Sequence, residues 1–475
     1  MKNVLKTILI AISITCLWSC EREFTYRGGE EGLYFSMDTV MFDTIFTSIG
    51  STTQNFKVYN PYDEDLLIKS IELAGGESTG FRINVNGYSE NALTDVQIGA
   101  RDSLFIFVEI TIDPMGSNKP FVVNDSIIFQ TSKHLQSVKL VAYGQDVVLM
   151  RQEWLKTQTL TKDKPYLIYD YVVVDSAETV SIDPGARLYF YKDASLLVLG
   201  TLEVNGTKEE PVLFTGHRQE EWYEDKPGQW GYIHLLPESG KSTFNNAIIK
   251  NGMMGILADS VGLDDNPIEI HNTRIEHISS FGLLAQSASL NVSNCIFGDS
   301  GNNSLALTVG GSYEFNHCTF ANYFDWTFRT NPSIFLNNYF LDENDNQQIV
   351  PLKKANFYNC IIYGKNRNEL GFDLKFEDSE IPEADAKYLF DHCLIRLVED
   401  FDTSDETKYK NIITDKDPSF IDYNEYNYQL DTLSAAKDIG KISVGESFPF
   451  DILNISRLED DGPDLGAYER VEKSK

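Results

Sequence analysis

One short phrase recurs through the second half of the chain and constrains the fold more than any other feature. A polar residue stands before a small residue and an apolar pair in FNNAIIKNG, IHNTRIEHI, VSNCIFGDS, FNHCTFANY, FLNNYFLDE, FYNCIIYGK and FDHCLIRLV. Aligned on the small residue, these phrases are 26, 22, 23, 20, 22 and 33 residues apart. A repeat of this length predicts a solenoid in which each phrase is one coil.

The repeat predicts two stacked rows of side chains. In a parallel β-helix, equivalent residues of successive coils lie about 4.8 Å apart, so a repeated Asn can bond along the stack as a ladder. The long last spacing predicts an insertion, DLKFEDSEIPEADA. The small residues are Ala247, Thr273, Cys295, Cys318, Asn338, Cys360 and Cys393. The polar residues before them are Asn246, Asn272, Asn294, His317, Asn337, Asn359 and His392.

The cysteines at the small position have a structural explanation. Cysteine is small, apolar and often buried, so we expect Cys295, Cys318, Cys360 and Cys393 to be free thiols in the core. A Cys295–Cys318 disulfide is the alternative, since stacked positions are close enough to bridge. A zinc site is disfavoured because the chain has no C-x-x-C pair.

The N-terminus has the pattern of an export signal. MKNVLKTILIAISITCLWSC begins with two lysines and continues with an apolar run too short to span a bilayer. Its end, Leu17 to Cys20, resembles the lipobox of bacterial lipoproteins, although Trp18 is larger than the residue usual there. The resemblance implies acylation of Cys20 and a stable lipid anchor; an ordinary secretory signal is the alternative.

The segment after the signal has the sequence pattern of a β-sandwich. Short alternating strands in FKVYNPYDEDLLIKSIELAGG, FRINVNG, SLFIFVEITIDP and DSIIFQTSKHLQSVKLVAYGQD are separated by turns such as Asn60-Pro61 and Asn86-Gly87. The spacing predicts an immunoglobulin-like sandwich. The segment resembles sandwich modules related to those of cilia-associated proteins, which bacterial surface proteins also carry.

Two further stretches resemble known families, and the two resemblances together extend over about two thirds of the chain. GQWGYIHLLPESGKSTFNNAIIKNGMMGI resembles the opening coils of right-handed parallel β-helix proteins in the pectate-lyase-like superfamily, notably lipoproteins of Bacteroides-type bacteria. DPSFIDYNEYNYQLDTLSAAKDIG with FDILNISR and GPDLGAYE resembles the terminal module of choice-of-anchor proteins, with Ala435 in place of the usual proline. We expect Pro463 to Glu469 to help close the open end of the helix.

These patterns predict an all-β chain with an immunoglobulin-like β-sandwich, a right-handed parallel β-helix and a C-terminal cap. The expected boundaries are a signal peptide at 1–19, a tether at 20–32, the sandwich at 33–147, the β-helix at 148–398 and the capping module at 399–475.

Catalytic and metal-binding motifs are weak. The resemblance raises the prospect of a polysaccharide lyase or glycoside hydrolase, but Asp264 and Asp265 lack the companion motifs of polygalacturonases. Asp342 to Asn346 starts like a calcium loop, yet the sixth position is not Gly and the twelfth is Lys353. His217, His234 and His277 have no triad or metal spacing. The sequence therefore assigns no catalytic residue, metal or cofactor.

Aromatic residues in one polar loop favour carbohydrate binding over catalysis. HRQEEWYEDKPGQWGY contains Trp222, Tyr223, Trp230 and Tyr232, whose flat faces can stack on sugar rings. The alternative for Trp230 is that it packs inside the first full coil.

The net charge and a set of short sequons predict the partners, the location and the modification of the chain. A net charge of −31 disfavours nucleic acid and other polyanions as partners. We expect a lipid-anchored outer-membrane protein at the cell surface that acts in binding or adhesion through an extended β-helix surface, with polysaccharide or a surface protein as its partner; a structural spacer is a further alternative. Asp-Ser and Asp-Thr followed by an apolar residue resemble the O-glycosylation sequon of Bacteroides-group bacteria. These candidates are Thr39, Thr44, Ser103, Ser126, Ser176, Ser260 and Thr432.

Overall fold

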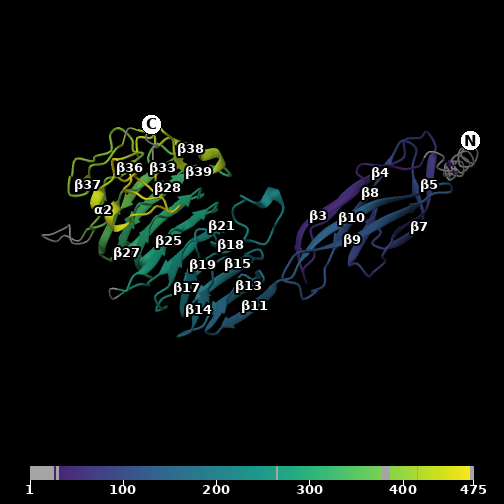
Figure 1. Cartoon of the computed structure of the whole chain (residues 1–475), viewed down its shortest axis with the longest axis horizontal. Helices are drawn as coiled ribbons and strands as arrows, with labels where there is room; N and C mark the ends of the chain where they lie inside the picture. Colours follow the sequence, from purple (N-terminus) through teal and green to yellow (C-terminus); the bar gives the residue numbers. More distant parts are fainter. Residues whose placement is uncertain (1–25, 28–31, 264–265, 377–385, 415, 471–475) are drawn as a thin grey trace, which may run out of the picture. The chain divides into compact units, whose positions relative to one another are not determined.

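The computed structural model describes residues 26–27, 32–263, 266–376, 386–414 and 416–470. Nearly all regular elements are strands, as the sequence predicts, and the chain divides into two compact units, Met1–Asp146 and Val147–Lys475 (Figure 1). The signal peptide, Cys20, and Asp264 and Asp265 lie outside the described residues, as does most of the predicted insertion.

The first unit consists of two sheets that share one apolar core. Period-2 alternation is visible in β8, where Leu104, Ile106 and Val108 are buried and Phe105 and Phe107 are exposed. One sheet contains β1 (Tyr26–Arg27), β3 (Thr39–Phe46), β5 (Asp65–Leu73), β7 (Ala92–Ile98), β9 (Phe121–Gln130) and β10 (Leu135–Gln145). The other contains β2 (Tyr34–Phe35), β4 (Gln54–Tyr59), β6 (Phe81–Val85) and β8 (Ser103–Ile110).

The second unit is built on a 25-stranded sheet in which every pairing is parallel, and strands pair with those one coil further along the chain. This is the topology of a parallel β-helix with three strands per coil. Successive coils therefore stack three columns of strands, which we call columns A, B and C, around a continuous core (Figure 1).

Each coil runs from column B to column A and then to column C. Column A contains β15 (Arg187–Phe190), β18 (Val212–Gly216), β21 (Ala247–Lys250), β24 (Arg274–Glu276), β26 (Ile296–Gly298), β28 (Thr319–Asn322), β33 (Ile361–Gly364) and β36 (Leu394–Ile395). Column B contains β12 (Gln158–Leu160), β14 (Thr179–Ile182), β17 (Thr201–Asn205), β20 (Thr243–Asn245), β23 (Ile268–His271), β32 (Leu352–Tyr358), β35 (Leu389–Asp391) and β37 (Tyr409–Lys410). Column C contains β16 (Ser195–Val198), β19 (Ile233–Leu235), β22 (Ile256–Asp259), β29 (Ile334–Asn337) and β34 (Leu370–Asp373).

Four longer strands bend through a corner and belong to two columns. They are β11 (Val148–Leu155), β13 (Tyr166–Val174), β25 (Leu283–Ser293) and β27 (Leu305–Asn316).

The repeated Asn or His lies at the corner between columns B and A, where the backbone adopts a left-handed conformation. The φ angle is 50° at Asn246 and Asn272, 52° at Asn294, 50° at His317, 52° at Asn359 and 53° at His392. Asn and His tolerate positive φ better than most residues. The small residue that follows starts column A and points into the core, as the 0% exposure of Cys295 and Cys318 shows.

One predicted step of the repeat is wrong. Phe315 of β27 pairs with Phe357 of β32, and the next residue of the ladder after His317 is Asn359, not Asn337. Asn338 lies in column C, where its side chain bonds the backbone of Lys375. The coil after Cys318 is therefore 42 residues long and carries a hairpin of β30 (Tyr339–Leu341) and β31 (Gln347–Ile349).

The C-terminal residues pack on the side of the helix, against column A, and not on its end. They contain β38 (Phe420–Asp422), η3 (Tyr423–Glu425), β39 (Asn427–Leu430) and α2 (Ile442–Ser447). Their apolar side chains share a core with outward-facing Ile296, Ala321 and Ile361. Buried Arg457 bonds Asn294 (3.1 Å) and Glu469 (3.1 Å), which joins this segment to the ladder.

The predicted position of the cap is corrected accordingly. Within Pro463–Glu469, the Gly466 N–H donates to the Asn359 carbonyl and the Ala467 N–H to the Thr319 hydroxyl, both on the side of the helix. Parallel pairing also continues past the predicted boundary at 398, through β37 and a bridge at Ile413. Leu397, Phe401 and Ile412 pack against the last part of the core.

Candidate functional site

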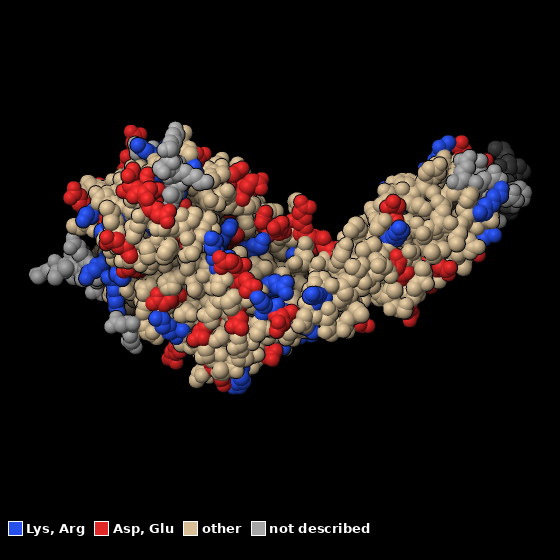
Figure 2. All heavy atoms as spheres, in the orientation of Figure 1, with Lys and Arg blue, Asp and Glu red and all other residues tan. Residues whose placement is uncertain are grey.

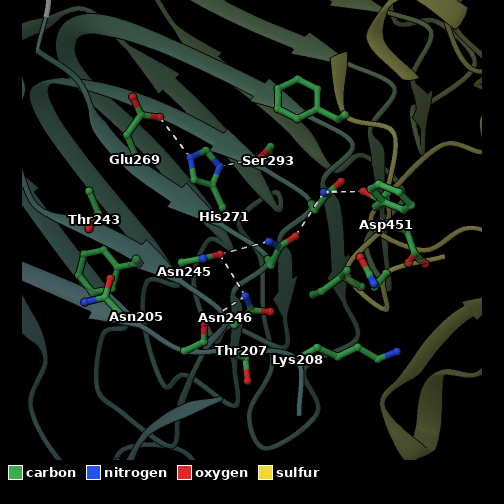
Figure 3. Close-up of a pocket in the computed structure, with 18 of the residues that line it drawn as sticks. Asn205, Thr207, Lys208, Thr243, Asn245, Asn246, Glu269, His271, Ser293 and Asp451 are labelled. Atoms are coloured by element: carbon green, nitrogen blue, oxygen red, sulfur yellow. Dashed lines mark hydrogen bonds and ion pairs between the residues drawn. The ribbon is translucent and has the colours of Figure 1, made fainter. Parts of the chain in front are cut away.

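A groove of about 850 Å³ lies between column B and the C-terminal segment. The floor comes from β17, β20, β23 and β25, and the opposite wall from residues 447–454 (Figure 3). Its lining is Asn205 to Glu209, Thr243 to Asn246, Glu269, His271, Asn272, Ser293, Asn294, Ser447 to Ile452 and Asn454.

Strand alternation puts polar side chains on the floor. Phe244, Ile270 and Val292 point into the helix core and are at most 1% exposed. The residues on either side of them must point outward, because successive side chains of a strand face opposite ways. Thr243 and Asn245 of β20, Glu269 and His271 of β23 and Ser293 of β25 thus share one surface.

A bonded chain crosses this surface through His271. Its Nδ1 lies 2.7 Å from the Ser293 hydroxyl, and its Nε2 lies 3.3 Å from a Glu269 carboxylate oxygen (Figure 3). Glu269 also accepts from Lys241 (3.4 Å) and Asn291 (3.3 Å). Both ring nitrogens are therefore held, and the imidazole is fixed in orientation.

A row of amides forms the side of the groove next to the corner ladder. Asn272 donates to Asn245 at 3.2 Å, and Asn294 donates to Asn272 at 3.3 Å and to the Phe450 carbonyl at 2.9 Å. Asn246 also donates to Asn245 at 3.1 Å. Each amide has two donors and an acceptor with two lone pairs, so the row retains capacity for a ligand.

The C-terminal wall contributes the aromatic ring of Phe450, whereas its carboxylate, Asp451, is not available to a ligand. Phe450 is 51% exposed beside the amides. Asp451 accepts from the N–H groups of Leu453 (2.8 Å), Ile455 (2.6 Å) and Glu469 (2.9 Å). Burial raises the pKa of Asp451. This carboxylate therefore holds the wall together.

Lys208 is the cation of the groove (Figure 3). Within the described part of the chain its ammonium group has no hydrogen bond or ion pair, and the residue is exposed. Glu209, next to it, is also exposed.

This arrangement suits the recognition of hydroxyl-rich molecules. Amides, a fixed imidazole and a hydroxyl supply directional bonds, and Phe450 supplies a flat apolar face. A glycosidase needs two carboxyl groups on either side of the scissile bond. Here Glu269 is bonded to Lys241 and His271, and Asp451 is occupied by backbone N–H groups.

The aromatic residues predicted from the sequence lie outside this groove, and one prediction is corrected. Trp230 is 0% exposed, stacks on Phe190 at 4.1 Å and donates to the Lys250 carbonyl at 2.8 Å, so it has no free face for a sugar. It packs in the helix core, as the alternative held, but between β18 and β19 and therefore not in the first full coil. Tyr232 is half-buried beside His234, Tyr223 is half-buried under Arg218, and Trp222 is 69% exposed.

The predicted thiols are confirmed as core residues. Cys295, Cys318, Cys360 and Cys393 are free and buried. The Cys295 thiol lies 3.2 Å from the Ser293 carbonyl, and burial raises its pKa. A buried, protonated thiol is a poor nucleophile.

The other candidate positions are spread over the chain. His217 is half-buried with its pKa lowered to about 4 by burial, and His277 lies 3.5 Å from Asp225. Asp342 closes the β30–β31 hairpin by accepting from the N–H groups of Asn344 and Asn346. Among the glycosylation candidates, Ser176 and Thr432 are exposed and Thr39, Thr44, Ser103, Ser126 and Ser260 are half-buried.

Sequence reasoning missed the groove although a signal for it exists. The phrases TFNN, EIHN and NVSN alternate polar and apolar residues directly before the repeated Asn. Such alternation places the polar members on the outer face of column B. The partner wall could not be found, because residues 447–454 reach the floor only through tertiary packing.

Comparisons with known proteins identify no family for this chain. No family model and no curated protein matches the chain. A family 123 glycoside hydrolase from Clostridium perfringens aligns with 10% identity and a TM-score of 0.18, over 25% of this chain and 26% of that one. The ASH/PapD-like domain 7 of human CEP192 aligns with 7% identity and a TM-score of 0.17, over 27% of this chain and 94% of that domain. The chain thus spans about a quarter of the hydrolase it matches.

Proposed function

We propose that this protein binds glycans in the groove between column B and residues 447–454. The observation that carries the proposal is an amide and imidazole row beside exposed Phe450 in one groove of about 850 Å³. Sugar recognition needs directional hydrogen bonds together with a flat apolar contact, and groups of both kinds line this groove.

The proposed setting is the bacterial cell surface. In this proposal the chain is acylated at Cys20, is exposed on the outer membrane, and contains an immunoglobulin-like sandwich followed in sequence by a right-handed β-helix. The C-terminal segment is a choice-of-anchor-type module. The lipobox-like end of the N-terminal sequence supports the anchor. Among the described residues, none of the helices has the length and apolar composition of a membrane span.

The anchor is tested by metabolic labelling. Cells that express the wild-type chain or Cys20→Ser are fed an alkyne fatty acid, and the purified proteins are compared. Label on the wild type and none on the variant supports the lipid anchor; equal labelling contradicts it.

Binding is tested with the chain from residue 21 onward, which keeps every described residue. A glycan array is read for the wild type and for a groove variant, Asn245→Ala with His271→Ala. Ser181→Ala is the matched control, because Ser181 also faces outward from column B but does not line the groove. Loss of signal in the groove variant alone supports the proposal, and retention of signal contradicts it.

A second candidate function rests on the Glu269–His271–Ser293 chain. A hydroxyl, an imidazole and a carboxylate bonded in this order can act as nucleophile, base and orienting group in ester hydrolysis. The substrate would be an acylated glycan. Release of acetate from acetylated xylan by the wild type and not by Ser293→Ala would establish this activity; no release would leave the groove as a binding site.

A further inference from the structure

Two exposed tryptophans from distant parts of the chain meet on the β-helix unit. Trp222 belongs to η1 (Glu221–Tyr223), in the loop that joins β18 to β19. Trp326 belongs to the loop that joins β28 to β29. Their ring centroids are 6.2 Å apart at an interplanar angle of 78°. We propose that Trp222 and Trp326 form a second carbohydrate site, specific for uncharged sugar chains.

The exposure of these rings has no explanation in the packing of the fold. Trp222 is 69% exposed and Trp326 is 41% exposed, and Phe328, two residues further on, is 91% exposed. Exposed aromatic surface costs free energy in water, because burying it is favourable. Adjacent exposed aromatic rings therefore indicate a surface that a ligand covers.

The loop that carries Trp222 is firmly held. Gln229 donates to the carbonyls of Tyr223 (2.5 Å) and Lys226 (2.8 Å), and Asn251 donates to that of Glu224 (3.0 Å). Asp225 lies 3.5 Å from His277. A loop whose backbone is already held loses little conformational entropy when it binds a ligand.

A polar pocket of about 290 Å³ lies under the same loop. Thr215, Arg218, Glu221, Lys250 and Asn251 are among its lining residues. Glu221 and Tyr223 are the sequence neighbours of Trp222, and both line this pocket. Sugar hydroxyls bond to hydroxyl, amide and carboxylate groups such as these, which supports a saccharide as the occupant.

The carboxylates near the two tryptophan rings determine whether charged or uncharged sugars can bind. Glu221 and Glu224 beside Trp222 are exposed, and the side chain of Asp325 beside Trp326 is 70% exposed although it also lies 3.6 Å from the Lys365 ammonium group. Carboxylates accept hydrogen bonds from hydroxyl groups but repel uronic acids and sulfate esters. The site therefore suits an uncharged chain.

This surface is separate from the groove. Its loops leave the ends of column A that lead to column C, whereas the groove lies on column B, and no residue of either loop lines the groove. The inference rests on the proposed function in one respect, since it takes glycan binding as the activity. It adds a second contact through which one long chain can be bound more tightly.

The test compares soluble polysaccharides by affinity electrophoresis with the chain from residue 21 onward. The probes are mannan, xylan and β-glucan as uncharged chains and polygalacturonate as an acidic one. The variant is Trp222→Ala with Trp326→Ala, and the control is Trp154→Ala, another Trp at the surface (53% exposed) with no aromatic contact among the described residues. We expect the double variant to bind an uncharged chain about tenfold more weakly or worse, and the control to bind like the wild type.

Each other result has a defined meaning. Unchanged binding in the double variant overturns the second site, and so does a wild type that binds none of the uncharged chains. Preference for polygalacturonate overturns the specificity. Binding lost in the groove variant but kept in the tryptophan variant supports the proposed function and rejects this inference, so the two can fail separately.

Discussion

The corner residue of each coil combines two roles in one side chain. At Asn272 the backbone has a φ of 50°, and the amide bonds Asn245 of the preceding coil and Asn294 of the following one. The first role requires a residue that tolerates a left-handed conformation, and the second requires a donor and an acceptor. Asn meets both, which explains why the phrase repeats it.

The conformational role predicts the ranking of two variants. Asn272→Val and Asn272→Gly both lose the amide bonds, so their difference reports the cost of the backbone conformation. We expect Val to be less stable than Gly by about 1–2 kcal/mol in urea unfolding, because a left-handed conformation costs that much for a residue with a Cβ. At extended Asn291 in β25 the order should reverse, since strands favour β-branched residues. A lack of reversal would contradict this explanation.

Asp299 predicts a pH dependence of stability. Burial raises its pKa from 3.8 to about 7, and its oxygens accept from the Tyr323 N–H (2.8 Å) and the Tyr428 hydroxyl (3.0 Å). Between about pH 4 and pH 7 the folded state keeps a proton that the unfolded state has released. The free energy of unfolding therefore falls as pH rises through this window and levels off above it.

Thermal unfolding between pH 4 and pH 8 tests this prediction. Asp299→Asn is uncharged at every pH, so its melting temperature should fall less than that of the wild type across the window. The exposed Asp193→Asn serves as the control and should follow the wild type. A variant that falls as steeply as the wild type would show that other buried carboxyls, such as Asp464 with a pKa raised to about 6, control the slope.

At the scale of elements, the sequence pattern predicts the repeating coil correctly but places one repeat wrongly, at Asn337 and Asn338. FLNNYFLDE has the same sequence pattern as the corner phrase, because the column C strand β29 also ends in Asn before apolar residues. The step therefore looked regular although the coil holds an extra hairpin. Only the pairing of Phe315 with Phe357 reveals the true register.

Deleting the hairpin tests the corrected register. Val350 donates its N–H to the Asn338 carbonyl at 2.8 Å, so the two ends of the insertion already meet. Replacing residues 339–349 by Gly-Gly should lower the melting temperature by only a few degrees, since surface loops contribute little to the core. Replacing 305–315 in β27 by Gly-Gly removes core residues and should abolish folding. If both deletions unfold the protein, the hairpin belongs to the core after all.

The side-on packing of residues 416–470 could not be predicted from the sequence. Apolar residues on the outer face of column A, such as Ile296 and Ile361, follow the corner phrase as an ordinary apolar pair. The sequence cannot tell which of the two points inward and which meets a partner. The contact that fixes the segment, Arg457 to Asn294, joins residues 163 positions apart. The groove depends on the same contact and was missed for the same reason.

At the scale of the whole molecule, net charge limits the ligands that can approach. The chain carries −31, and red Asp and Glu side chains are scattered over the face drawn in Figure 2. Such a surface lowers the local concentration of anions at low ionic strength. Uncharged sugars do not experience this field, so the composition agrees with the ligand proposed for the site of Trp222 and Trp326.

The net charge of the chain predicts how binding responds to salt. An uncharged glycan forms no ion pairs, so its Kd should change by less than about twofold between 20 mM and 500 mM NaCl. Polygalacturonate should be excluded at 20 mM and, where it binds, should bind only once salt has screened the repulsion. Isothermal titration at the two salt concentrations measures both. Binding that weakens steeply with salt would instead point to a direct ionic contact, and Lys208→Gln would then test whether the free ammonium group of the groove provides it.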